Sequence, residues 1–260
     1  MKLPELATQE RQSGNTYFCS VKQYPTGDMD VTSIKLTSED TFGRGRGGVR
    51  KNVDKSTMDD ATLASSRRRA AKNVRVRSLC LEADNLLTLT FRENVIDQAE
   101  SWKIFRKFSR LMAWRFGDRW AYVAVQEFQE RGAIHFHLAI RGYYYQGTVR
   151  RLWLRATGEY GGNIDFSGPK RMAGKNSWNP RRIGSYLAKY LTKTDIAGFN
   201  KRRYSSGGKI PEPVKVKFWI SYGLSMASVL SQIILDNSRL QVKTLVTLKG
   251  FYQTIYLSTS

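Results

Sequence analysis

The sequence predicts an α+β fold built on antiparallel strands. Residues 85–91, 121–128 and 134–140 are rich in β-branched and aromatic side chains, which favour strands. Residues 97–116 and 179–193 instead carry apolar side chains at steps of three and four, the spacing of an amphipathic helix. Because three residues separate the second and third strands, these two strands are expected to form an antiparallel hairpin.

Both expected helices have apolar stripes and suitable ends. Gly117 follows the first helix, and Asn179 and Pro180 begin the second, where Asn can cap the first turn and Pro fits within it. The stripes consist of Trp102, Phe105, Phe108 and Met112 in the first helix and Ile183, Leu187 and Leu191 in the second. We expect each stripe to face the core.

The two histidines of the chain, His135 and His137, lie on the third strand. Side chains two residues apart point to the same face of a strand, so the two imidazoles share one face. In a hairpin whose three-residue loop ends at Gly132, Glu127 pairs with His135 and its carboxylate joins that face. These donors predict a divalent metal site with Glu127 as the third ligand, and Gln129, on the same face, is the alternative.

The charge of the chain indicates a polyanionic partner. The 260 residues include 43 Lys and Arg against 22 Asp and Glu, a formal net charge of +21. Many of the basic residues cluster among aromatic ones, which favours nucleic acid over a merely soluble basic protein. Bases stack on aromatic rings while basic groups follow the phosphates. The expected nucleic-acid contacts are Arg141, Tyr143, Tyr145, Arg150, Arg151, Lys170, Arg171, Lys175, Arg181 and Arg182, whereas Trp153 is expected in the core.

Two further segments bear on organisation and location. Residues 43–77 are rich in Gly and Arg and suggest an arm that lies along phosphates or a solvated linker, with a helix near residues 61–72. Residues 218–235 are uncharged, but a row of serines on one face favours a packed amphipathic helix over a membrane span. The two cysteines lack metal or redox spacing, which indicates a reducing cytoplasm.

The second helix carries two tyrosines beside its apolar stripe, Tyr186 and Tyr190. Each is followed three residues later by a lysine, Lys189 or Lys193. A tyrosine hydroxyl titrates near pH ~10, and a nearby ammonium favours the phenolate and balances charge on an attacked phosphate. Taken alone, the pattern also fits ordinary Tyr–Lys packing on a surface helix.

Together, the histidines and the tyrosines resemble the motifs of the HUH endonuclease superfamily. Residues 127–137 look like its metal-binding motif, and residues 87–91 look like its first-strand motif. Residues 186–190 are similar to the two-tyrosine motif of rolling-circle replication initiators of the phage gene A type. The three motifs follow the order of the family, and the resemblance covers roughly residues 79–220.

The resemblance implies a central five-stranded antiparallel sheet flanked by helices, with the metal on the sheet and the tyrosine helix beside it. Residues 79–220 would form this endonuclease domain. An N-terminal extension with the basic Gly/Arg-rich arm would occupy residues 1–78, and a helical or strand extension would occupy residues 221–260.

The same resemblance implies the nicking of single-stranded origin DNA with Mg²⁺ or Mn²⁺. Tyr186 or Tyr190 would attack the phosphorus, leaving a 5′-phosphotyrosyl bond and a free 3′-hydroxyl, and the ends would later be rejoined. The setting would be rolling-circle replication of a phage or plasmid in the cytoplasm of a bacterial host, on an origin hairpin and away from membranes. The sequence lacks the glycine-rich loop of P-loop NTPases, so a helicase and a polymerase would come from the host.

Two other functions fit the same sequence. A relaxase or transposase of the superfamily would share the motifs. A non-catalytic nucleic-acid-binding module with a similar sheet would carry the histidines and tyrosines incidentally.

Overall fold

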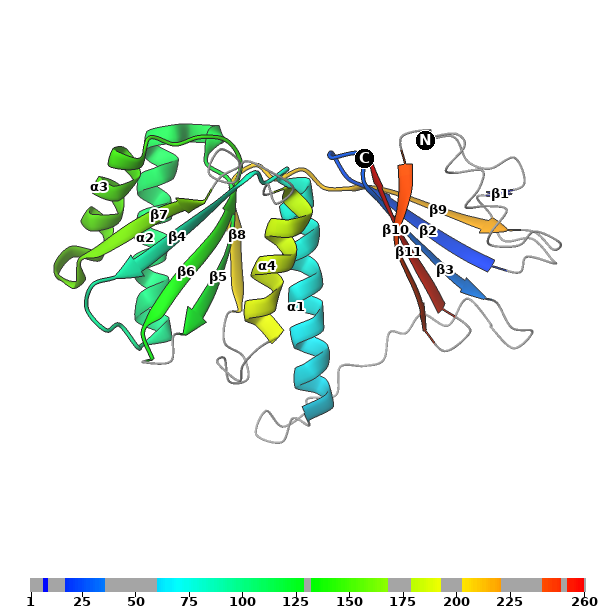
Figure 1. Cartoon of the computed structure of the whole chain (residues 1–260), viewed down its shortest axis with the longest axis horizontal. Helices are drawn as coiled ribbons and strands as arrows, with labels where there is room; N and C mark the ends of the chain where they lie inside the picture. The colour runs from blue at the N-terminus through cyan, green and yellow to red at the C-terminus, as the bar shows by residue number, and fades with distance from the viewer. Residues whose placement is uncertain are drawn as a thin grey trace. The chain divides into compact units, whose positions relative to one another are not determined.

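The computed structural model describes residues 7–8, 17–35, 60–128, 132–167, 179–192, 203–220, 240–248 and 252–259. The chain forms two compact units (Figure 1). One consists of residues 53–211, and the other combines residues 1–52 with residues 212–260.

The central unit is built on a five-stranded antiparallel sheet, which confirms the predicted fold class. The strand order is β7-β4-β6-β5-β8, and every neighbouring pair is antiparallel. Its strands are β4 (Asn85–Phe91), β5 (Tyr122–Phe128), β6 (Ile134–Ile140), β7 (Gly162–Ser167) and β8 (Tyr204–Gly207). The three strands predicted from the sequence are therefore present, and β6 lies at the centre.

Helices cover both faces of this sheet (Figure 1). On one face lie α2 (Gln98–Phe116) and α3 (Gln146–Thr157), each followed by a short 3-10 turn, η1 (Gly117–Arg119) or η2 (Gly158–Tyr160). On the other face lie α1 (Asp60–Cys80) and α4 (Pro180–Thr192), which pack side by side. Each strand consequently sends alternate side chains into one of two separate cores.

The core beneath α2 is mainly aromatic. Phe136 of β6 stacks on Phe105 at a ring-centroid distance of 4.8 Å and meets Trp102 edge-on at 4.9 Å. Trp153 is fully buried, as the sequence predicted, and its ring meets Phe108 at 5.3 Å. Fully burying one such side chain stabilises the fold by roughly 1.5–3 kcal/mol, so this layer holds the sheet firmly.

The ends of the two predicted helices carry their expected caps. The Asp97 side chain accepts a hydrogen bond from Ala99 N at 2.8 Å, and the Asn179 side chain accepts one from Arg182 N at 2.9 Å. Gly117 ends α2 with φ of 57°, a conformation that favours glycine.

The second unit is a six-stranded antiparallel sheet that joins the two ends of the described chain. Its strand order is β1-β9-β2-β3-β11-β10. The strands are β1 (Ala7–Thr8), β2 (Tyr17–Gln23), β3 (Met29–Lys35), β9 (Val214–Ile220), β10 (Leu240–Leu248) and β11 (Tyr252–Thr259). Phe18 and Trp219 pair across β2 and β9 with ring centroids 4.6 Å apart.

The units divide the chain at different residues from the expected ranges 1–78, 79–220 and 221–260. The difference arises because β9 pairs with β2 and so belongs to the six-stranded sheet, while α1 packs against α4 in the central unit. The helix expected over residues 218–235 is wrong at its start, since residues 218–220 complete β9, and residues 221–235 lie outside the described residues. In the described part of the chain, none of the helices has the length and hydrophobicity that a bilayer span needs.

The basic segment before residue 78 forms a longer helix than the sequence suggested. The helix expected near residues 61–72 extends over the whole of α1, and Ala70, Ala71 and Val74 are buried with the apolar residues of α4. At least from residue 60 on, this segment is therefore a packed helix rather than an arm or linker. Residues 43–59, with the Gly/Arg-rich sequence, lie outside the described residues.

Close packing of α1 on α4 depends on Gly184, which predicts the effect of a larger side chain. A Cβ atom at this position would lie 3.1 Å from Arg75 Cα and from Ser78 Cβ. We expect Gly184→Val to lower the free energy of unfolding by about 1–3 kcal/mol, the usual cost of overpacking, measured by urea denaturation. Ser185→Val, at a half-buried position of the same helix, is the control. Equal stability of the two variants would contradict the close approach.

Candidate active site

The expected hairpin register places three polar donors on one face of the sheet. Glu127 pairs with His135 across β5 and β6, as predicted, and Gly132 has φ of 83° at the end of the loop. His135 and His137 are buried on the face covered by α4, while Phe136 points into the aromatic core of the opposite face. Gln129, the alternative ligand, lies outside the described residues.

His137 makes polar contacts through both ring nitrogens. Its Nε2 lies 2.7 Å from Glu127 Oε2, and its Nδ1 lies 3.1 Å from Thr88 Oγ1. An ionised carboxylate only accepts hydrogen bonds, so a neutral His137 carries its proton on Nε2 and accepts from the Thr88 hydroxyl at Nδ1. Burial lowers the pKa of His137, and the hydrogen bond and charge of Glu127 partly oppose that shift.

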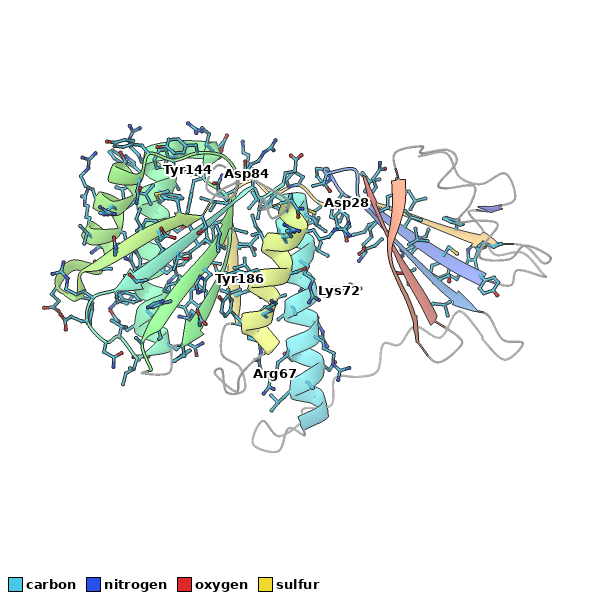
Figure 2. All side chains as sticks on the ribbon, viewed as in Figure 1. Asp28, Arg67, Lys72, Asp84, Tyr144 and Tyr186 are labelled. Atoms are coloured by element: carbon cyan, nitrogen blue, oxygen red, sulfur yellow. The ribbon has the colours of Figure 1, made fainter. Side chains whose placement is uncertain are left out.

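The two tyrosines of α4 lie directly against His137. Ile183 and Leu187 are fully buried towards the sheet, which turns the neighbouring face of α4 onto the histidine strand. The Tyr190 ring stacks on the His137 ring with centroids 4.6 Å apart and planes 7° apart. Tyr186 meets the same imidazole edge-on at 5.9 Å, and Figure 2 shows it on the side of α4 nearest the sheet.

The two tyrosine hydroxyls are hydrogen-bonded to each other. Tyr190 Oη donates to Tyr186 Oη at 2.5 Å. The pKa of Tyr190 is raised, mainly by burial and further by the Tyr186 hydrogen bond and the nearby Glu127 charge. In this arrangement Tyr190 keeps its proton, while the Tyr186 oxygen is the acceptor of the pair.

The donors present fit part of a divalent metal site. Glu127 and His137 are close enough to be adjacent ligands, and imidazole with carboxylate suits Mn²⁺ or Zn²⁺ better than Mg²⁺. As the side chains stand, no group of three or more His, Cys, Asp or Glu residues in the described part of the chain could hold a metal ion. Two positions are therefore in place, and His135 shares their face.

The structure separates the expected nucleic-acid contacts into groups. Arg181 and Arg182 lie in the first turn of α4, on the same helix as the tyrosines. Arg141 follows the far end of β6, six residues from His135, or about 20 Å along a strand. The residues beside it, all on the α3 side and not at the histidine face, are Tyr143, Tyr145, Arg150 and Arg151, of which the two tyrosines are well exposed.

Several other expected site residues have a different or undescribed setting. Arg141 pairs with Glu82 at 2.6 Å. Lys189 is exposed on α4, three residues after Tyr186. Lys193, Lys170, Arg171 and Lys175 lie outside the described residues.

Thr88 is a site residue that the sequence analysis missed. It faces His137 across β4 and β6, and Thr90 faces His135 in the same way. The alternation of Leu and Thr in β4 was a usable signal, because it puts both threonines on one face. What the sequence did not supply was the pairing of β4 with β6, which brings that face to the histidines.

The segment that carries this site matches a known family. Residues 84–195 match the family model of the replication-associated protein ORF2. The matched segment runs from the start of β4 to just beyond α4, and so contains Thr88, Glu127, both histidines and both tyrosines. The match supports a replication initiator and a role in DNA replication. No curated protein and no solved structure matches the chain.

The contact between Glu127 and His137 predicts how the histidine titrates. Removing the carboxylate charge with Glu127→Gln takes away the influence that opposes burial, so we expect the pKa of His137 to fall further below its ordinary value. NMR titration of the chelator-treated protein measures this directly, because the chain has two histidines. Glu100→Gln, on α2 across the sheet, is the control. A rise in the pKa of His137 in Glu127→Gln would contradict the contact.

Proposed function

We propose that the protein is a replication initiator that cuts and rejoins single-stranded DNA by tyrosine attack. The observation that carries this proposal is the stacking of Tyr190 and the edge contact of Tyr186 on His137, within a segment that matches a replication-associated family. Two nucleophiles, an imidazole and a carboxylate thus converge on one face of the sheet. This set of groups is what a phosphoryl transfer through a covalent intermediate requires.

In the proposed reaction, the phenolic oxygen of one tyrosine attacks the phosphorus of a phosphodiester. The bond from phosphorus to the 3′-oxygen breaks, that oxygen takes up a proton, and the phosphate remains joined to tyrosine as a 5′-phosphotyrosyl ester. One phosphodiester is exchanged for another, so rejoining by attack of a 3′-hydroxyl needs no nucleotide hydrolysis. The free 3′-hydroxyl is available as a primer.

Glu127, His135 and His137 would hold a divalent ion, which would polarise the scissile phosphate. Release of the Nε2 proton of His137 would leave the ring protonated at Nδ1. The Thr88 hydroxyl could then accept from Nδ1 instead of donating to it, because a hydroxyl serves in either role. Thr88 would thus orient the ring in both states.

We further propose that Tyr186 makes the first attack. Tyr190 donates its proton to Tyr186 and has a raised pKa, so Tyr190 is the weaker nucleophile until this hydrogen bond is lost. Lys189 lies one helical turn from Tyr186 and would balance negative charge near its oxygen.

The nucleophile assignment is tested with 3′-labelled single-stranded DNA that carries the origin of the encoding replicon. With Mn²⁺ present, the protein should become covalently labelled, and Tyr186→Phe with Tyr190→Phe together should abolish the labelling. Tyr186→Phe alone should lower the initial rate more than Tyr190→Phe alone. Tyr160→Phe, at a half-buried tyrosine packed against the other core, is the control. Labelling that survives the double substitution would overturn the assignment.

The third ligand is tested by Mn²⁺ binding to variants of β5 and its loop. We expect Glu127→Ala to weaken Mn²⁺ affinity by roughly tenfold or more, because Glu127 is beside His137, whereas Gln129→Ala should have a smaller effect. Isothermal titration calorimetry gives both affinities. The opposite ranking would make Gln129 the ligand and would leave Glu127 as a partner that orients His137.

A relaxase or transposase would use the same residues, and the family match favours replication. A non-catalytic binding module would bind DNA without ever becoming labelled. The labelling experiment therefore separates that alternative from the proposed enzyme.

A further inference from the structure

The outer side of α1 carries a row of basic side chains. Arg68, Lys72 and Arg75 are exposed and follow one another at steps of four and three residues, so they line one side of the helix. Arg69, beside them, is exposed as well. After its first residue, Asp60, the sequence of α1 contains no acidic side chain to neutralise this row. Such a stripe repels itself and is favourable beside a polyanion.

The packing of α1 on α4 extends this row towards the tyrosines. Gly184 brings the two helix backbones together at Arg75, so the outer sides of the two helices adjoin. The sequence of α4 also has no acidic residue, and α4 exposes Arg182 and Lys189. Lys189 lies three residues after Tyr186, which faces His137. We call the following set the basic face: Arg68, Arg69, Lys72, Arg75, Arg182 and Lys189. Figure 2 labels Lys72 on α1 and Tyr186 on α4.

The chemistry of the basic face selects phosphates rather than bases. The sequence of α1 has no aromatic residue, and both tyrosines of α4 contact His137, so this surface lacks rings on which bases could stack. Proteins that hold single strands combine charge with stacking. A rigid row of charges instead matches a rigid array of phosphates, and residues 68–75 span about 10 Å of helix beside a duplex with one charge per about 1.7 Å.

We propose that the basic face binds the phosphate backbone of double-stranded DNA next to the single strand that the tyrosines attack. This inference rests on the proposed function, and it adds a duplex-binding surface that does not depend on base sequence. Residues of α1 would hold the duplex arm of the DNA. Residues of α4 would mark the junction where the strand enters the site.

The experiment compares two variants that each lose three positive charges. Arg68→Ala/Lys72→Ala/Arg75→Ala removes the row on α1, and Arg106→Ala/Lys107→Ala/Arg110→Ala removes three exposed basic residues of α2, across the sheet. Binding of a fluorescent duplex of about 20 base pairs and arbitrary sequence is measured by anisotropy over a range of salt concentrations. We expect the α1 variant to bind roughly tenfold or more weakly and to lose about 2.7 from its salt slope, three contacts at ~0.9 each.

The control variant should stay within about twofold of the unchanged protein, and thermal melting should show that both variants are folded. Equal losses of duplex affinity in the two variants would overturn the proposal, because binding would then follow the net charge of the whole chain. A larger loss for a single-stranded probe than for the duplex would overturn it as well.

The covalent labelling assay separates this proposal from the proposed function. The α1 variant should still become labelled on single-stranded origin DNA, because its tyrosines and histidines are intact. Tyr186→Phe/Tyr190→Phe should lose labelling and keep its duplex affinity. Absence of labelling in the unchanged protein, with duplex binding still dependent on α1, would reject the nicking function alone.

Discussion

The site depends on the alternation of side chains along β6. Phe136 and Leu138 point into the aromatic core under α2, and this packing fixes the height and rotation of the strand. His135 and His137 are then held on the opposite face, where the core is made by α1 and α4. A shift of one residue in register would exchange the two sets and bury the imidazoles among aromatic rings. The same contacts therefore stabilise the sheet and orient the site.

The second requirement is that α4 lies close to the sheet. Ile183 and Leu187 are fully buried there, and Gly184 allows α1 to pack closely on α4. With α4 held from both sides, Tyr186 and Tyr190 contact His137 through their rings. The position of two candidate nucleophiles is thus set by ordinary apolar packing, and the polar groups contribute the chemistry rather than the placement.

Local patterns in the sequence were sufficient for the elements of the central unit and for the hairpin. The strands, the capped helices and the pairing of Glu127 with His135 each follow from residues that are near one another in the chain. Longer-range pairings were out of reach, because a β-ladder between distant segments leaves no local signal. This explains why the pairing of β9 with β2 and the contact of Thr88 with His137 became visible only in the structure. It also explains why α1 was expected to be an arm: its partner, α4, begins 100 residues after the end of α1.

The hydrogen bond between the tyrosines gives the proposed reaction an order. Before Tyr186 reacts, its oxygen accepts the proton of Tyr190, and that bond contributes to the raised pKa of Tyr190. Once Tyr186 is esterified, its oxygen is bonded to phosphorus and becomes a much weaker acceptor. The Tyr190 hydroxyl is then released beside the same imidazole and carboxylate. The first attack would therefore activate the second tyrosine, so that two neighbouring nucleophiles act in sequence rather than in competition.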